Sequence, residues 1–235
     1  MPKTKLTEKQ KKVDTDLWII IIATFLVFGI FIIFQKDIYG VIKNAEVPIL
    51  FRVFLGAIFQ YGLAGFGITL VAIYRKERFS FYGLKTEGMF SSIALCSLSF
   101  IPNIVFNFMT GRIDRYLPFH SVWTTNEVLS SGFPINAIGM LMTATAWGFF
   151  EGFNYVVISE KINKRYPIKY KWLNLGAIVC AVICILIHGA IGVTPEGIIE
   201  MITVMIIVYG MLTAKEFTGN AWGCVFVFVF LWNAF

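Results

Sequence analysis

Long apolar runs separated by short polar segments recur along the whole chain. The first of them, residues 17–34, contains no charged residue and is close to the roughly 20 residues that a helix needs to cross a bilayer. Seven predicted spans cover residues 17–34, 49–74, 89–109, 134–159, 173–193, 198–214 and 221–235. Backbone groups inside lipid must satisfy their own hydrogen bonds. The sequence therefore predicts an all-α, polytopic transmembrane helix bundle of about seven spans.

The composition excludes an ordinary soluble protein. Hydrophobic residues make up 57% of the chain and charged residues only 14%, against about 25% charged residues in soluble domains. The lipid bilayer is therefore the predicted partner. We predict no nucleic-acid binding, because no soluble element carries a basic face with interleaved aromatic residues. The cysteines all lie in apolar runs, which predicts reduced thiols that pack as small hydrophobic side chains.

The distribution of basic residues predicts the orientation of the chain. Fifteen of the twenty Lys and Arg residues fall on one side of the seven spans. Cytoplasmic loops are enriched in these residues, so we expect a multi-pass protein of the cytoplasmic membrane with a cytoplasmic N-terminus. Residues 1–16 form a predicted basic tail that is disordered or lies on the membrane, and residues 17–235 form one transmembrane domain. Residues 79–84 are expected to lie at the lipid headgroups.

One carboxylate, Glu151, lies well inside the fourth apolar run. A charge at that depth costs about 2.5 kcal/mol or more, so this side chain should face the bundle interior and have a partner or a function. The predicted partners are His188 and Asn233, and these three are the candidate catalytic residues. The alternative is a protonated carboxyl group that is hydrogen-bonded between helices.

The rise of a helix predicts the depth of each of the three groups. At about 1.5 Å per residue, Glu151 lies roughly 10–13 Å from the cytoplasmic end of its span, His188 about 22 Å and Asn233 about 18 Å. His188 and Asn233 should therefore be nearly level, with Glu151 closer to the cytoplasm. This arithmetic does not favour direct contact between Glu151 and His188.

Cys180, Cys184 and His188 are spaced four residues apart and share one helix face. Thiolate and imidazole groups bind zinc or copper. On a straight helix, however, the three groups spread over about 12 Å, whereas zinc–ligand bonds are near 2.0–2.3 Å. At most two of them could share an ion. His188 is the candidate metal ligand and Zn the candidate cofactor, while packed small residues beside a hydrogen-bonded histidine are the favoured interpretation.

Other polar residues have simpler interpretations. Glu196 and Glu200 open the sixth span, where a helix N-terminus favours carboxylates. His120 lies among aromatic residues in a loop and is expected at the surface. The chain contains no HExxH, no GxSxG, no phosphate-binding loop and no dinucleotide signature. The sequence thus gives no support for the chemistry of soluble enzymes.

Three short stretches carry a family resemblance. They read FEGFNY at residues 150–155, CILIH at residues 184–188 and VFLWN at residues 229–233. Their order and spacing resemble the EExxxR, FxxxH and HxxxN motifs of the CPBP family. These are the CAAX prenyl protease and bacteriocin-processing intramembrane proteins, also called the ABI family. The resemblance covers residues 81–235 and includes a TGNAW turn, similar to the TGSLW-like turn of the family, before the last helix.

The match is partial in each motif. In the first, Glu151 occupies the position of the second glutamate, Phe150 that of the first and Tyr155 that of the arginine. In the second and third motifs the histidine and the asparagine are retained, whereas two other positions have changed. The changed positions are Cys184 in place of phenylalanine and Val229 in place of histidine.

The resemblance implies a CPBP-like bundle with an intramembrane cavity lined by Phe150, Tyr155, Cys184 and Val229. In the family, the first glutamate is thought to activate water, while the histidines and asparagine hold a metal or stabilise an oxyanion. Phe150 cannot act as a base, and Val229 can neither ligate nor donate. Glu151 points about 100° away from the position of its neighbour on a regular helix, so it is not a simple substitute.

These observations leave three hypotheses. The favoured one is a non-catalytic CPBP-like homologue, a pseudoenzyme that binds a hydrophobic peptide, a lipid or a partner membrane protein in the cavity. The alternative is an active intramembrane endopeptidase, a metalloprotease-like hydrolase acting on hydrophobic or prenylated peptides. In that case Glu151 is the general base, and His188 and Asn233 bind a metal or the oxyanion. The third is a small proton-linked transporter that uses Glu151.

Overall fold

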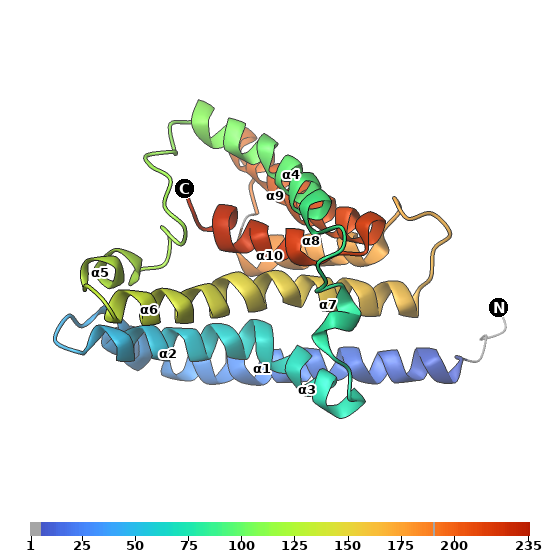
Figure 1. Ribbon diagram of the computed structural model, residues 1–235, viewed down its shortest axis with the longest axis horizontal. Coiled ribbons are helices and arrows are strands. Elements are labelled where there is room, and N and C mark those ends of the chain that lie inside the picture. The colour runs from blue at the N-terminus through green and yellow to red at the C-terminus, as the bar shows by residue number, and fades with distance from the viewer. Residues whose placement is uncertain (1–5, 190) are drawn as a thin grey trace.

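The computed structural model describes residues 6–189 and 191–235, and helix makes up 76% of the structure. These described residues contain no strand, which confirms the all-α fold class. Three long helices lie side by side as a bundle in which each packs against the other two, and this bundle forms one layer of the molecule (Figure 1). They are α1 (Glu8–Lys43), then α2 (Ile49–Tyr61) continued by the π-helical η1 (Gly62–Phe66) and α3 (Gly67–Arg75), and finally α6 (Ile135–Thr143) continued by the π-helical η3 (Ala144–Phe150) and α7 (Glu151–Arg165).

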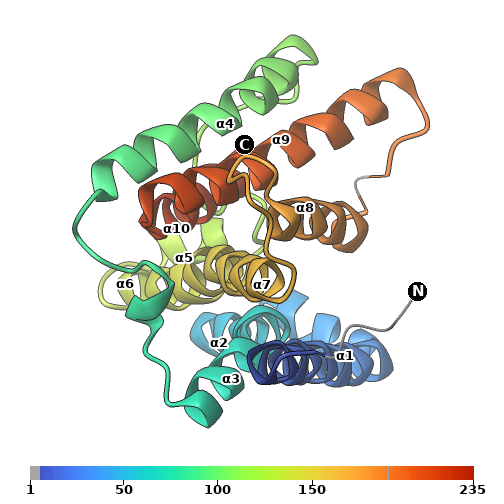
Figure 2. The same ribbon diagram turned by 90° about the vertical axis from the view of Figure 1, so that its right-hand side faces the viewer.

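A second layer crosses the first at an angle. It consists of α4 (Met89–Met109) and α9 (Pro195–Thr218), which run obliquely to the long helices in Figure 1 and across the view in Figure 2. The core between the two layers contains α8 (Leu175–Ile187) and α10 (Trp222–Val227), the latter continued by the π-helical η4 (Phe228–Trp232). Two short elements, the 3₁₀ turn η2 (Phe79–Tyr82) and α5 (Thr125–Ser130), lie in the connections.

Several helices are suited to a membrane. Within the described residues, four are long and apolar enough to span one, namely Glu8–Lys43, Ile49–Arg75, Met89–Met109 and Pro195–Thr218. Two shorter apolar helices are Leu175–Ile187 and Trp222–Trp232. Large apolar side chains on α1, including Ile22, Phe25 and Ile33, are more than half exposed, as expected for a surface that contacts lipid. The arrangement with seven spans stays a prediction.

Helix α1 begins earlier and ends later than the sequence pattern predicts. Thr7 and Gln10 form a capping box at its start, and the helix continues to Lys43. Val13 and Asp16 are buried. The prediction of a disordered or membrane-lying tail is therefore wrong for residues 8–16, because the charged side chains of this segment pair with other helices. Residues 1–5 lie outside the described part of the chain.

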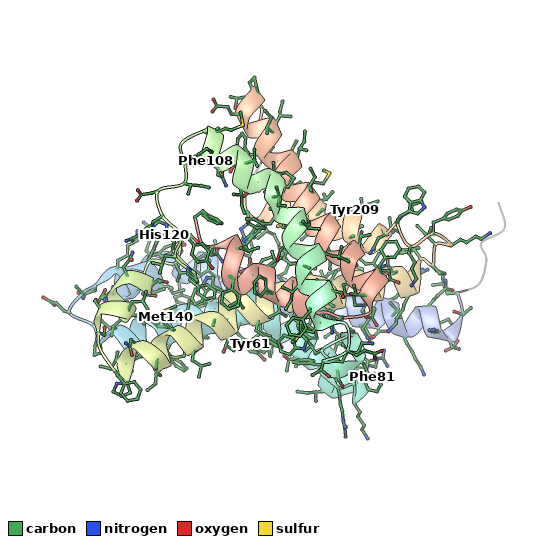
Figure 3. The ribbon with its side chains drawn as sticks, turned by 45° about the horizontal axis from the view of Figure 1, so that its top comes forward. Tyr61, Phe81, Phe108, His120, Met140 and Tyr209 are labelled. Atoms are coloured by element: carbon green, nitrogen blue, oxygen red, sulfur yellow. The ribbon has the colours of Figure 1, made fainter. Side chains whose placement is uncertain are left out.

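The segment at residues 79–84 does not simply lie at the headgroups. The side chain of Tyr82 is buried, and the ring of Phe79 packs 5.0 Å from the ring of Phe153. Phe81, by contrast, is exposed and points away from the bundle, as Figure 3 shows. The alternation of apolar residues looked amphipathic in isolation, but tertiary packing turns two aromatic side chains inward.

A network of charged groups joins α1, α3 and α7 at the end of the bundle that carries most of the lysines. Lys161 is 2% exposed, and its Nζ lies 2.7 Å from Asp16 Oδ2 and 3.0 Å from Glu77 Oε2. Asp16 is equally buried and also accepts a 2.6 Å hydrogen bond from Arg75 Nε. Buried charges are tolerated only with such a full set of partners. The network therefore fixes the relative positions of these three helices.

Replacing Lys161 should destabilise the protein much more than replacing a neighbouring lysine. In Lys161→Met, Asp16 loses one of its two cationic partners inside the bundle, and we expect a loss of about 3 kcal/mol. The matched control is Lys164→Met, since Lys164 is 42% exposed and pairs with Glu160 on its own helix; its loss should be below about 1 kcal/mol. Thermal unfolding in detergent micelles measures both, and equal losses would contradict this account of the network.

The same network predicts a decline in stability in acid. Burial raises the pKa of Glu77, but hydrogen bonds from Tyr82 and Lys161 and the charge of Lys161 outweigh it, so the pKa lies below the usual 4.5. A lowered pKa contributes stability above pH 4.5 that is lost as the pH falls through the folded-state value. The melting temperature should fall below that pH, and less steeply in Glu77→Gln. The exposed control Glu87→Gln should follow the wild type throughout.

Candidate functional site

Glu151 and His188 are in direct contact. Glu151 is the first residue of α7 and is 7% exposed, and His188 caps the C-terminus of α8. His188 Nε2 lies 3.4 Å from Glu151 Oε1. The second carboxylate oxygen, Oε2, accepts a 2.7 Å hydrogen bond from Gln60 Nε2 of α2. Both oxygens of the buried carboxyl group therefore have a polar partner, which offsets the cost of removing it from water.

Asn233 completes the group from the last helix. It follows η4 directly, and its Oδ1 accepts a 2.9 Å hydrogen bond from Ser121 Oγ. The backbone N–H groups of Ser121 and Leu117 donate to the carbonyl oxygens of Asn233 and Ala234, so this loop holds the end of the last helix in place. Asn233 Nδ2 is buried and, within the part of the chain that the structure describes, has no hydrogen-bond partner. It is a donor available to an acceptor in the adjacent space.

One cavity brings the three predicted residues together. It has a volume of about 310 Å³, and its lining includes Glu151, His188 and Asn233. Gln60 and Trp147 also line it. A carboxylate in contact with an imidazole, facing a cavity together with a free amide donor, can take a proton from a bound molecule and stabilise negative charge on it.

The predicted separation in depth was wrong. Glu151 was placed 10–13 Å from the end of its helix because the span was expected to end near residue 159. Helix α7 continues to Arg165, so Glu151 lies about 21 Å from that end. His188 follows the start of α8 at Leu175 by about 20 Å. The two side chains are therefore level, and the error came from the helix boundary.

Three of the polar residues of the site lie beside a π-helical segment. Glu151 directly follows η3, Asn233 directly follows η4, and Gln60 lies two residues before η1. A π-turn inserts a residue and changes which side chain faces a neighbour, and such turns are frequent at functional sites. The sequence analysis assumed a regular helix with 100° per residue, and on that assumption the direction of the Glu151 side chain could not be predicted.

The four residues predicted to line the cavity are absent from the lining of the cavities described, and they lie in or against the apolar core instead. They are Phe150, Tyr155, Cys184 and Val229. Tyr155 is buried and stacks on Phe228 with ring centroids 5.6 Å apart, and Phe150 packs edge-on against Tyr61. These side chains contact neighbouring helices in the apolar core, where close packing stabilises them.

The site does not fit a zinc ion. Among residues 6–189 and 191–235, no group of three or more His, Cys, Asp or Glu side chains is placed to hold a metal. Glu151 and His188 supply two ligands, whereas catalytic zinc sites use three protein ligands. Cys180 Sγ lies 3.6 Å from the carbonyl oxygen of Tyr155 instead. The unpaired atom of Asn233 is an N–H donor, which cannot coordinate a cation.

Two site residues escaped the sequence analysis. Gln60 is the one amide side chain of the second apolar run, a signal that was present but unused. Ser121 lies in a long loop, where a serine carries no signal of its own.

Glu200 was interpreted only as part of a charged first turn, yet it lines a neighbouring cavity. His120 is half-buried in the loop (Figure 3) and lies outside the described lining of both cavities.

Comparison of the chain with protein-family models, with curated proteins and with solved structures gave no match. The fold and site geometry of the chain itself therefore carry the functional argument.

The close approach of η3 and η4 is testable through Gly148. A Cβ at this position would lie 2.5 Å from Val229 Cγ2, so Gly148→Ala should push the two helices apart and cost about 1–3 kcal/mol. Adding Val229→Ala removes the clashing methyl and should restore part of that loss in thermal unfolding. Gly29→Ala is the matched control, because a Cβ there meets nothing within 4 Å; a similar loss in this variant would contradict the argument.

Proposed function

We propose that this chain is an integral membrane hydrolase that cleaves a peptide bond in a membrane-associated polypeptide. The observation that carries the proposal is the contact of Glu151 with His188 at a cavity that also contains the unpaired amide donor of Asn233. The resemblance to the CPBP family supports the same reaction class. Of the three sequence hypotheses, this geometry favours the active endopeptidase.

The residues suggest a general-base mechanism. Glu151 takes a proton from a water molecule, whose oxygen attacks the carbonyl carbon of the peptide bond. Asn233 Nδ2 donates to the carbonyl oxygen as it becomes negative. The carbon–nitrogen bond then breaks, and the proton taken by Glu151 passes to the leaving amine. His188 lies against Glu151 Oε1. It orients the Glu151 carboxylate and stabilises the negative charge of that group during the proton transfer.

Gln60 has a positioning role in this proposal. Its amide donates to Glu151 Oε2, which leaves Oε1 as the oxygen directed toward His188. The helix that carries Gln60 lies outside the segment that resembles the family, residues 81–235. The first two helices would therefore contribute to the site rather than merely anchor the bundle.

The proposed topology places the cavity away from the cytoplasm. With seven spans and a cytoplasmic N-terminus, the ends of helices near Tyr39, Arg52 and Trp123 lie on the outer side. These residues line the cavity that contains Glu151. The charged network of Lys161 would then lie at the cytoplasmic face. A substrate would reach the site from the outer leaflet or from the outer aqueous phase.

A second candidate function is binding without catalysis. Phe150 and Val229 occupy the positions of a glutamate and a histidine in the motifs that the chain resembles, and both pack in the apolar core. A site with fewer polar groups can hold a hydrophobic peptide, a lipid or a partner helix without cleaving it. The proton-linked transporter stays a prediction without a specific structural observation in its favour.

A survey of new peptide termini in membranes distinguishes the two candidates. Glu151→Gln keeps the shape of the side chain and an acceptor for Gln60 but cannot take a proton, so termini produced by the wild type should fall by about 100-fold or more. Asn233→Ala should reduce them by about 100-fold through loss of the oxyanion donor.

The controls for that survey come from the same chain. Glu87→Gln replaces an exposed glutamate and His120→Ala a histidine outside the cavity lining, and both should keep the wild-type pattern. Each variant must reach the wild-type level in the membrane. If well-folded wild type and Glu151→Gln give the same termini, the hydrolase proposal is wrong and binding without catalysis is favoured.

A further inference from the structure

A second cavity adjoins the site from the side of the oblique helices. It has a volume of about 410 Å³ and lies between the outer parts of α4, α8 and α9. It shares His188, Asn233 and Ser121 with the cavity described above. The two cavities therefore meet at His188, Asn233 and Ser121, and Glu151 borders the first of them.

A ladder of amide side chains forms one wall of this second cavity. Asn107 Nδ2 donates to Asn103 Oδ1 at 2.9 Å, and Asn103 Nδ2 donates to Thr203 Oγ1 at 2.9 Å. Both asparagines lie on α4, a helix suited to span the membrane, and line the cavity. Polar side chains at such positions are costly and commonly face a functional or water-filled space. The ladder leaves amide oxygen and N–H groups that can bind a further polar molecule.

The charge of this cavity is balanced. Glu200 is the acidic residue in its lining, and its Oε2 lies 2.6 Å from Arg112 Nη1. His188 faces the carboxyl group of Glu151. Among the described lining residues, the charged groups therefore already have partners, and what remains are neutral hydrogen-bonding groups. Such a lining favours a neutral polar ligand over an ion, because an added charge would have no counter-charge.

The first cavity has a different character. Apart from the polar groups of the site and Arg52 and Thr124, its lining consists mainly of the aromatic rings of Tyr39, Trp123 and Trp147 and the aliphatic Ile42 and Val53. Aromatic and aliphatic linings favour apolar side chains. A molecule lying across the site would therefore meet an apolar surface on one side of the reacting group and a neutral polar surface on the other.

We infer that the second cavity is a substrate subsite for a neutral, polar peptide segment, while the aromatic cavity holds the apolar part of the same chain. The inference rests on the proposed function and specifies its substrate class: an amphiphilic polypeptide cleaved where an apolar stretch meets an uncharged polar one. The Asn103–Asn107 ladder hydrogen-bonds the polar segment, and Asn233 lines both cavities.

Cysteine accessibility tests the polar cavity without requiring catalysis. Asn103→Cys and Asn107→Cys would place thiols in the cavity, and Val105→Cys is the matched control. Val105 is exposed on the surface of α4 and lies about 200° around the helix from each asparagine, facing lipid. In membrane fragments open on both sides, a charged, water-soluble maleimide should label the first two variants about tenfold faster than the third. Wild type gives the background, since its four cysteines are buried.

Protection by peptides tests the ligand class. Millimolar acetyl-Gly-Asn-Ser-Gly-amide, which is neutral and polar, should slow labelling of Asn107→Cys. The acidic counterpart acetyl-Gly-Asp-Asp-Gly-amide and the apolar acetyl-Gly-Leu-Leu-Gly-amide should slow it less. Labelling at the rate of Val105→Cys would overturn the inference, and so would rapid labelling that the neutral peptide does not slow or slows no more than the other two.

The two proposals fail separately. If the neutral peptide protects Asn107→Cys but no new termini appear in the survey of membranes, the subsite stands and the hydrolase proposal fails. If cleavage depends on Glu151 but the neutral peptide gives no selective protection, the hydrolase stands and the assignment of the second cavity is wrong. The comparison uses only cysteine variants whose melting temperature equals that of the wild type, so that loss of folding does not imitate accessibility.

Discussion

The burial of one carboxyl group determines the organisation of the centre of this molecule. Glu151 lies among apolar helices, where an uncompensated charge would cost several kcal/mol. Its two oxygens reach Gln60 on α2 and His188 on α8, so three separate segments of the chain must converge on it. Asn233 on the last helix reaches the same cavity. The site therefore depends on the whole bundle rather than on one motif.

The convergence requires helices that depart from regular geometry. The π-helical turns η1, η3 and η4 lie beside Gln60, Glu151 and Asn233, and Gly148 lets η3 and η4 approach closely enough to bring two of these groups together. Away from the site, the Lys161 network fixes α1, α3 and α7 at the opposite end. The three long helices therefore carry the charged network at one end and line the first cavity at the other.

The hollow end contains two cavities with different linings. Aromatic side chains surround the first and a ladder of amides the second, and His188 and Asn233 lie where they meet. The proposed hydrolase would need both an apolar surface for its substrate and access for water. The second cavity lies along α4 and α9, which run obliquely to the long helices (Figure 2).

The sequence by itself determined the helical class and the suitability for a membrane, and it singled out three polar residues that the structure brings to one cavity. Apolar runs of spanning length allow little else, and Glu151, His188 and Asn233 are conspicuous within them. The contact between Glu151 and His188 was decided by the tertiary structure, because it depends on where α7 ends and on π-turns that no residue pattern specifies. Gln60 and Ser121 were missed for the same reason: their side chains are ordinary in sequence, and only the packing of the helices brings them into contact with Glu151 and Asn233.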